Sequence, residues 1–136
     1  MSRISSWKDP NSPHKDLVYG ENVIATSEPH ATEAGVNTFK NGGNAVDAAL
    51  SAAITLTVTE PCSNGIGGDG FTIVAHQGKL HGLNASGKSP IAWNKDYFNR
   101  YETMPESGWD SVTTPGLVSQ WVALHDRFGK LPFQDL

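Results

Sequence analysis

Residues 42–71 read GGNAVDAALSAAITLTVTEPCSNGIGGDGF and contain the clearest helix and loop signals of the chain. Asn44 is a typical helix N-cap and Asp47 falls in the first turn, so the pattern predicts a helix from Ala45 to about Thr59. Apolar residues cover nearly its whole circumference and leave one thin stripe of small polar side chains at every fourth position. Such a helix is buried on most sides inside a larger body, and it is shorter than the roughly 20 apolar residues of a membrane span.

A glycine-rich loop follows this helix, with four glycines in residues 64–71. The order is helix, loop, strand, whereas a phosphate-binding loop needs strand, loop, helix. This order argues against nucleotide binding. We expect the glycines to let the chain leave the helix sharply and pack its backbone closely, so that Gly67→Val would impair folding.

The flanking segments predict short strands and further helices in an α/β (α+β) fold. The expected elements are a strand at 21–27, helices at 29–41, 96–102 and 117–128, and a hairpin of 71–76 with 79–83. Thr114 is read as the cap of the helix at 117–128, and Gly129 as its end. Residues 131–136 resemble the start of another helix. We therefore expect an irregular arm at 1–20 and, at 21–136, the N-terminal portion of a longer fold that is truncated at its C-terminus.

Composition excludes several classes of partner. The net charge of −4 comes without a long run of like charges, which argues against nucleic acid and against an anionic membrane surface. The single cysteine, Cys62, has no internal disulfide partner and is read as a loop residue rather than a catalytic thiol. The N-terminal segment lacks the apolar stretch of a signal peptide, so we expect a cytoplasmic setting.

Isolated polar residues add little to this picture. His76 and His81 flank the hairpin reversal without a carboxylate or thiolate at ligand spacing, so we predict no metal site and no cofactor. Asp69 either lines the glycine loop with an acidic group or serves as a turn residue that tolerates positive φ.

Residues 42–71, with SEPHATEAG at 27–35 and TTPGLVSQWVALHDRFGKLPF at 113–133, resemble the N-terminal part of the large subunit in the gamma-glutamyltranspeptidase family. The resemblance implies an N-terminal nucleophile hydrolase with a four-layer αββα sandwich. Its precursor cuts itself to expose a threonine, which attacks an amide carbonyl with its own amine as base and forms an acyl-enzyme.

The same resemblance places no catalytic residue in this chain. In the family the nucleophile begins the small subunit in a Thr-Thr-His setting, whereas Thr113-Thr114 here precede Pro115. The implied partners are a threonine-bearing small subunit or downstream segment and a small-molecule amide, and the assembly is compatible with a homo-oligomer. Ser2, exposed if Met1 is removed, is a remote alternative nucleophile.

The substrate-binding candidates are Asn84, Ser86 and Lys88. Transpeptidases of the family typically carry an Asp-x-Arg-Glu segment whose arginine clamps the glutamyl α-carboxylate, and Ser86 occupies that arginine position in LNASGKSP at 83–90. Lys88 would share the face of Ser86 only if the strand persisted through Gly87; otherwise Ser86 lies in a turn and Lys88 is solvated.

These residues predict a transpeptidase-like amidohydrolase or acylase whose substrate need not be gamma-glutamyl. The alternative is a non-catalytic family relative that keeps the fold for a ligand-binding or structural role.

Overall fold

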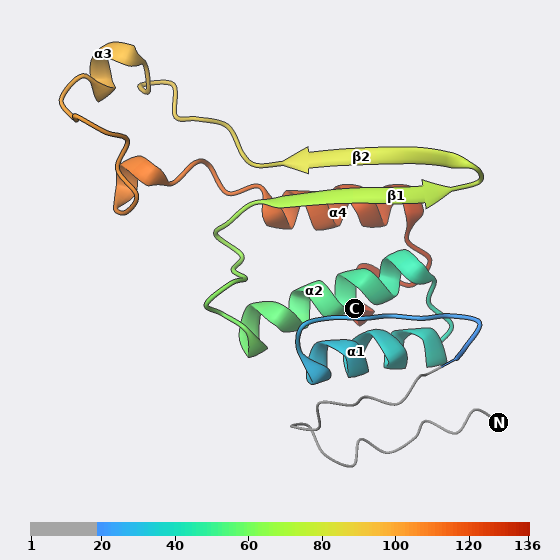
Figure 1. Cartoon of the computed structure of the whole chain (residues 1–136). Coiled ribbons are helices and arrows are strands. Elements are labelled where there is room, and N and C mark those ends of the chain that lie inside the picture. The colour runs from blue at the N-terminus through green and yellow to red at the C-terminus, as the bar shows by residue number, and fades with distance from the viewer. Residues whose placement is uncertain (1–18) are drawn as a thin grey trace.

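A computed structural model describes residues 19–136, so Ser2 and most of the expected arm at 1–20 lie outside the described residues. The elements, labelled in Figure 1, are α1 (Pro29–Lys40), α2 (Ala45–Thr59), β1 (Gly70–His76), β2 (Lys79–Ala85), α3 (Lys95–Phe98) and α4 (Leu117–Phe128). A short 3₁₀ turn at Trp109–Ser111 lies between α3 and α4, and another, at Phe133–Asp135, follows α4. The described part of the chain therefore has the expected mixed α+β composition.

The N-terminus of α2 is fixed by the two residues that the sequence singles out. Asn44 Oδ1 accepts the amides of Val46 and Asp47 at 2.9 and 3.0 Å, and the Asp47 carboxylate accepts the Asn44 amide at 2.9 Å. This reciprocal pair is a capping box, which satisfies helix N–H groups that have no partner within the helix. The predicted bounds Ala45–Thr59 are confirmed.

The hairpin β1–β2 is antiparallel, with Phe71 opposite Asn84 and His76 opposite Lys79. Its two-residue reversal uses Gln77 at φ 48° and Gly78 at φ 73°. Positive φ at both central residues matches the turn whose twist suits a tight hairpin. The register is therefore set by the turn, and it sends alternate side chains of β1 toward the helices.

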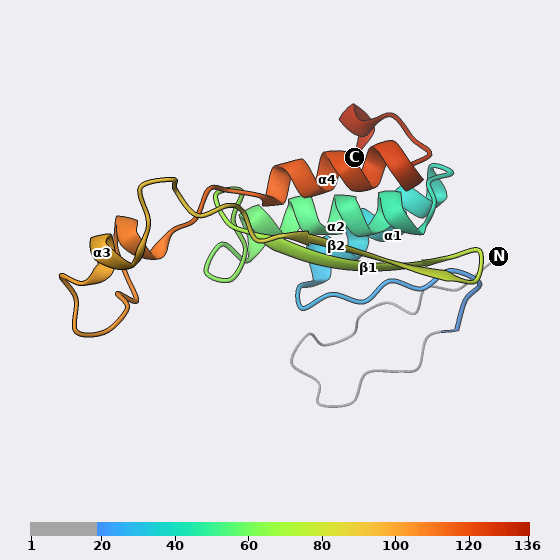
Figure 2. The ribbon, with the colours of Figure 1, turned by 90° about the horizontal axis from the view of Figure 1, so that it is seen from above.

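Helices α2 and α4 pack on one face of the hairpin, as Figure 2 shows from above. The buried core is formed by Leu50 of α2 with Trp121 and Leu124 of α4, and Val74 and Leu83 of the hairpin pack against it. Helix α1 packs on α2, and among the described residues none of its side chains belongs to the core that α2 forms with α4. The glycine loop and the end of β2 therefore lie at the same end of the helical layer (Figure 1).

The first half of the polar stripe of α2 faces into the protein, whereas Thr59 at its end is exposed. Asp47 and Ser51 are 0% and 3% exposed, while Ala45 and Ala49 are exposed and Val58 is 79% exposed. The apolar circumference of α2 is thus only partly covered by residues 19–136.

Three local predictions were wrong. Residues 21–27 are extended, but no strand of the described chain pairs with them, so they form no sheet. Helix α3 spans only Lys95–Phe98 and not 96–102. At α4 the N-cap is Gly116, without a side-chain cap, and not Thr114, because the carbonyl of Gly68 accepts the first free amides of the helix.

The glycine of this loop that packs closely is Gly70, against the side chains of Gln120 and Leu117, and not Gly67. A Cβ at Gly70 would collide with the Gln120 side chain, whereas a Cβ at Gly67 meets nothing within 4 Å in the described chain. The packing explanation of the loop is therefore retained, and the residue that carries it is corrected.

Candidate functional site

The candidate residues Asn84, Ser86 and Lys88 lie where β2 ends. Asn84 is exposed, and its Oδ1 accepts the Ser86 amide at 2.9 Å, which turns the chain out of the strand. Gly87 has φ 79°, a conformation that L side chains rarely adopt, so the strand does not continue through it. The half-buried Ser86 is thus in a turn, and Lys88 is exposed.

A second segment, Thr113–Gly116, fixes this turn from the other side. Thr113 Oγ1 donates to the Ser86 carbonyl at 2.8 Å, and the Thr114 amide donates to the Lys88 carbonyl at 3.0 Å. A Cβ on Gly87 would collide with the Thr114 carbonyl. The backbone around Ser86 is therefore held at both of its ends by residues almost thirty positions away.

The glycine loop joins the same junction. The Gly68 carbonyl accepts the amides of Gly116 at 3.0 Å and Leu117 at 3.2 Å. A Cβ on Gly116 would collide with the Ala85 carbonyl, so the start of α4 lies directly against the end of β2. Three segments that are distant in sequence, 64–70, 84–88 and 113–117, thus meet around Ser86. A role was predicted from the sequence for the segments 64–70 and 84–88. The contact of Thr113 was missed, because no local sequence pattern marks its hydroxyl as a hydrogen-bond donor to Ser86.

A groove of about 480 Å³ begins beside this junction and runs between α2, β1 and α4. Asn64 and Asp69 lie at its glycine-loop side, and small side chains of α2, among them Ala49, line its wall. Asp69 is exposed, so the acidic group that was expected along the glycine loop is in contact with solvent. Within residues 19–136 the groove combines apolar walls with a strand, β1, that pairs only with β2.

The histidines lie on the helical side of the hairpin, away from the junction. The ring centroids of His76 and His81 lie 5.7 and 5.2 Å from the ring centroid of Phe128. A guanidinium nitrogen of Arg127 lies 3.0 Å from His81 Nδ1. No group of three metal-ligating side chains was found within residues 19–136. Cys62 is exposed.

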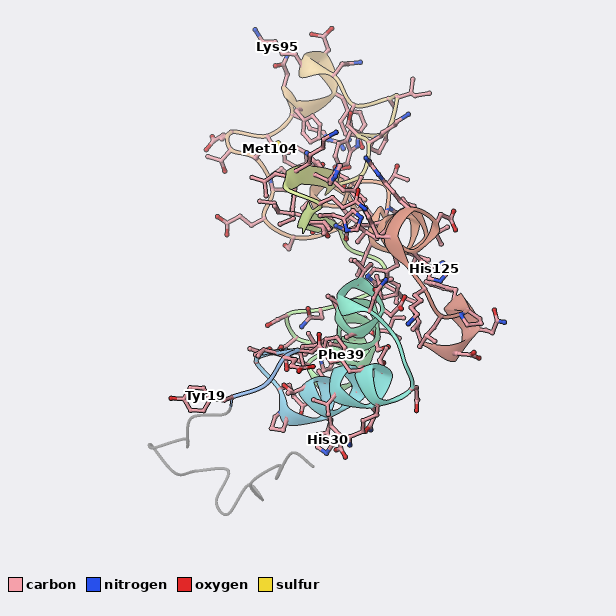
Figure 3. The ribbon with its side chains drawn as sticks, turned by 90° about the vertical axis from the view of Figure 1, so that its right-hand side faces the viewer. Tyr19, His30, Phe39, Lys95, Met104 and His125 are labelled. Atoms are coloured by element: carbon pink, nitrogen blue, oxygen red, sulfur yellow. The ribbon has the colours of Figure 1, made fainter. Side chains whose placement is uncertain are left out.

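One polar cluster was not anticipated from the sequence. The segment between β2 and α4 projects from the body, with Lys95 and Met104 at the end opposite His30 in Figure 3. In it Asp110 accepts hydrogen bonds from Tyr97, at 2.7 Å, from Tyr101, and from Arg100. The hydrogen bonds from Tyr101 and Tyr97, with the Arg100 charge, hold the pKa of Asp110 below its usual range. This cluster ties α3 to the 3₁₀ turn at 109–111, and no spacing rule in the sequence connects its members.

None of the helices within the described part of the chain combines the length and the apolar character that a membrane crossing needs.

The arrangement of the helix pair, the hairpin and the third helix matches solved structures of two enzymes over most of this chain. The chain superposes on gamma-glutamyltranspeptidase from Pseudomonas nitroreducens with a TM-score of 0.78 at 31% identity, over 87% of this chain and 37% of that one. It superposes on cephalosporin acylase from Bacillus halodurans with a TM-score of 0.75 at 41% identity, over 92% of this chain and 25% of that one.

Sequence comparison agrees with the structural match. The gamma-glutamyltranspeptidase family model matches residues 31–136. Glutathione hydrolase proenzyme 1 of Schizosaccharomyces pombe is 36% identical over 122 residues, covering 88% of this chain and 19% of that protein. The chain belongs to the gamma-glutamyltranspeptidase family, and it spans about a fifth of the length of the curated relatives it matches.

Proposed function

We propose that this chain is the N-terminal scaffold of an amidohydrolase or acyltransferase whose nucleophile is a threonine on another polypeptide or segment. The proposal is supported by family membership and by relatives named as a glutathione hydrolase proenzyme, a gamma-glutamyltranspeptidase and a cephalosporin acylase. A proenzyme is processed after synthesis, which fits a nucleophile exposed by cleavage. The comparisons give no support to a non-catalytic role. The cytoplasmic setting and the homo-oligomer stay predictions.

We propose further that the segment Asn84–Lys88 forms part of the acyl-group pocket. The observation that carries this is the position of Ser86, which lies at the junction of three segments and is held by Thr113 and Asn84. A pocket wall has to be fixed in this way if it is to select a substrate by shape.

The chemistry of Ser86 defines the expected substrate class. A guanidinium can hold a carboxylate through two parallel charged hydrogen bonds, and the serine hydroxyl has neither that charge nor that reach. Lys88 is exposed and lies outside the strand, so its ammonium does not replace the two parallel hydrogen bonds of a guanidinium. We therefore propose an acyl donor that lacks the glutamyl α-carboxylate, such as an uncharged or remotely charged acyl amide.

The first test is the intact mass of the complete natural gene product under denaturing conditions. Two polypeptides, one beginning with threonine, together with cleavage of an amide substrate, are expected. A single uncut chain that cleaves no amide would contradict the catalytic proposal.

The second test concerns the pocket and compares a gamma-glutamyl amide with an acyl amide that lacks the α-carboxylate. Ser86→Arg should raise the ratio of the two kcat/KM values in favour of the gamma-glutamyl amide by about tenfold or more, because a charged hydrogen bond is worth about 1.5 to 3 kcal/mol. Ser89→Arg places the same charge three residues away at an exposed position and should leave the ratio unchanged. A natural protein that already prefers the gamma-glutamyl amide would overturn the proposal for Ser86.

A further inference from the structure

The backbone of Ser86 is held entirely by side chains. Its amide donates to Asn84 Oδ1 at 2.9 Å, and its carbonyl accepts from Thr113 Oγ1 at 2.8 Å. The last paired residue of β2 is Ala85, so neither backbone group of Ser86 has a partner in the sheet. Two side chains from different segments therefore set the conformation of Ser86, and with it the direction in which its side chain points.

The side-chain hydroxyl of Ser86 has a different environment. Within residues 19–136 the hydrogen bonds of this residue are the two backbone contacts, and its Oγ has no partner there. A hydroxyl can both donate and accept a hydrogen bond. A side chain whose backbone is fixed and whose hydroxyl is unengaged is suited to binding a ligand in one defined geometry.

Thr113 reaches Ser86 from the far end of the projecting segment in Figure 1, since the two residues are 27 positions apart. Asp110 joins the two legs of this segment, because it accepts hydrogen bonds from Tyr97, at 2.7 Å, and from Arg100. Closing a long loop costs more conformational entropy than closing a short one. The contacts of Asp110 therefore shorten the loop that the contact between Thr113 and Ser86 has to close.

The surroundings of Thr113 favour a positioning role over a packing role. Thr113 is exposed, and its hydrogen bond to the Ser86 carbonyl is the only one that its side chain makes within the described chain. The neighbouring backbone contributes a second contact, from the Thr114 amide to the Lys88 carbonyl at 3.0 Å. The hydroxyl of Thr113 thus acts on the Ser86 turn and on no core residue.

We propose that Thr113 is a positioning residue for acyl-group selection. Its hydroxyl holds the Ser86 carbonyl so that the Ser86 hydroxyl meets a polar group on the acyl chain, and Asp110 keeps Thr113 in place. The inference rests on the proposed function, which makes Ser86 part of the acyl-group pocket. It gives Asn84 Oδ1 the same positioning role on the other side of Ser86.

The position of Ser86 defines the probe. By the family resemblance Ser86 stands where an arginine clamps the glutamyl α-carboxylate, so its hydroxyl should meet the far end of an acyl chain of glutaryl length. A terminal hydroxyl on the acyl chain can exchange a hydrogen bond with Ser86 Oγ, whereas a terminal methyl group cannot. The probes are therefore δ-hydroxyvaleryl anilide and hexanoyl anilide, which have the same chain length and differ in that terminal group.

The complete natural gene product and two variants at Thr113 test the proposal. The measured quantity is the kcat/KM for δ-hydroxyvaleryl anilide divided by that for hexanoyl anilide. Thr113→Val should lower this ratio about threefold to tenfold, the range of one neutral hydrogen bond, and Thr113→Ser should preserve it. Because Thr113 is exposed, the valine opens no cavity in the described chain. Equal ratios in the natural protein and Thr113→Val would overturn the proposal.

The Ser86→Ala background separates positioning from a general loss of structure. Ser86→Ala removes the hydroxyl that Thr113 positions and should itself lower the ratio. Thr113→Val should then change the ratio no further, because two residues that act through one contact are not additive. A damaged fold would lower both kcat/KM values equally. If Thr113→Val lowered the ratio as much in Ser86→Ala as in the natural protein, Thr113 would act by another route and the proposal would be overturned.

A third comparison tests the projecting segment. Asp110→Ala should lower the ratio in the same direction as Thr113→Val, by about two- to threefold, because the loop that the Thr113 contact closes becomes longer. Glu106→Ala removes a carboxylate from an exposed position of the same segment and should leave the ratio unchanged. Equal ratios in these two variants would overturn the part assigned to Asp110.

Hydrogen exchange follows the contact without any substrate. Thr113→Val should speed exchange of the Thr114 amide about tenfold, whereas Thr113→Ser should not. An unchanged Thr114 amide in Thr113→Val would overturn the proposal. A gene product that cleaves no amide would refute the proposed function, and acyl-group selection with it, even where the Thr114 amide responds. Amide cleavage with a ratio independent of Thr113 would refute the positioning role and keep the function.

Discussion

The Asp47 carboxylate of α2 accepts the backbone amide of Lys130, at 3.0 Å to Oδ1 and 3.2 Å to Oδ2. Asp47 is 0% exposed and also accepts the Leu131 amide at 3.2 Å, while Asn44 Nδ2 donates to the Phe128 carbonyl at 2.7 Å. One capping box therefore both starts α2 and anchors the chain that leaves α4. It connects two elements more than eighty residues apart.

Asp47→Asn should destabilise the folded chain by about 2 to 4 kcal/mol. The substitution replaces a buried acceptor oxygen with a donor that would face the amides of Lys130 and Leu131. Asp126→Asn is the control, since the Asp126 side chain is 74% exposed. Chemical unfolding of the gene product measures the difference, and equal free energies of unfolding for the two variants would show that the anchor contributes nothing.

The contact between α1 and α2 makes a separate prediction. Thr38 Oγ1 lies 2.7 Å from Ser51 Oγ, and both residues are buried. Thr38→Val should cost about 1 to 2 kcal/mol, because the buried Ser51 hydroxyl is left without its partner. Ser51→Ala should cost less, because the Thr38 hydroxyl can still donate to the Ala34 carbonyl at 3.0 Å. The double variant should cost less than the sum of the two single variants, by about 0.5 kcal/mol or more. Strict additivity in a double-mutant cycle would count against the hydrogen bond.

The junction around Ser86 predicts that a single methyl group is harmful at Gly116. A Cβ there would meet the Ala85 carbonyl, which is backbone and cannot rotate away. Gly116→Ala should therefore cost about 1 to 3 kcal/mol and displace the turn that carries Ser86. Gly67→Ala is the matched control, since its Cβ meets nothing within 4 Å in the described chain. Thermal unfolding would refute the close approach if both variants lost the same stability.

Local chemistry explains which parts of the fold could be predicted from the sequence. Asn44 and Asp47 are three residues apart, and Gln77-Gly78 is a two-residue turn, so the signals for α2 and for the hairpin are contained in short windows. Residues 23–27 alternate between exposed and half-buried, as a strand would, yet the predicted strand pairs with no other strand of the described chain. Alternation reports which side chains face the helices, however, and not whether a pairing strand is present.

Long-range contacts explain most of what was missed. The first half of the polar stripe of α2 turns inward because Asp47 finds its partners at 130–131 and Ser51 finds Thr38 on α1. Likewise the turn at Ser86 depends on Thr113. Asn84, Ser86 and Lys88 could be selected as candidates only through the family resemblance, and their role in substrate binding stays a prediction.

The N-cap of α1 gives a prediction about pH. Glu28 Oε1 lies 2.6 Å from His30 Nδ1, and Glu28 Oε2 accepts the Ala31 amide at 3.0 Å. Partial burial acts to raise the pKa of Glu28, but the hydrogen bonds from His30 and Ala31 outweigh it and lower that pKa from 4.5 to about 2. The hydrogen bond and the charge of Glu28 in turn raise the pKa of His30 above 6.5.

The signs of the two shifts define the pH window of this ion pair. A lowered pKa stabilises the fold above the unfolded value, so the contribution of Glu28 is lost as the pH falls from 4.5 toward 2. A raised pKa stabilises the fold below the unfolded value, so the contribution of His30 is lost as the pH rises through its raised pKa. The pair contributes fully between these limits, from about pH 4.5 to 6.5.

Glu28→Gln should return the pKa of His30 toward 6.5, because it removes both the charge and the acceptor that favour the imidazolium. NMR titration of the His30 ring measures this directly. Glu33→Gln is the matched control: Glu33 raises the pKa of His30 less than Glu28 does, so the His30 pKa should fall only slightly. If the two variants lowered the His30 pKa equally, the general negative charge of α1 would account for the shift, and the specific pairing of Glu28 with His30 would be refuted.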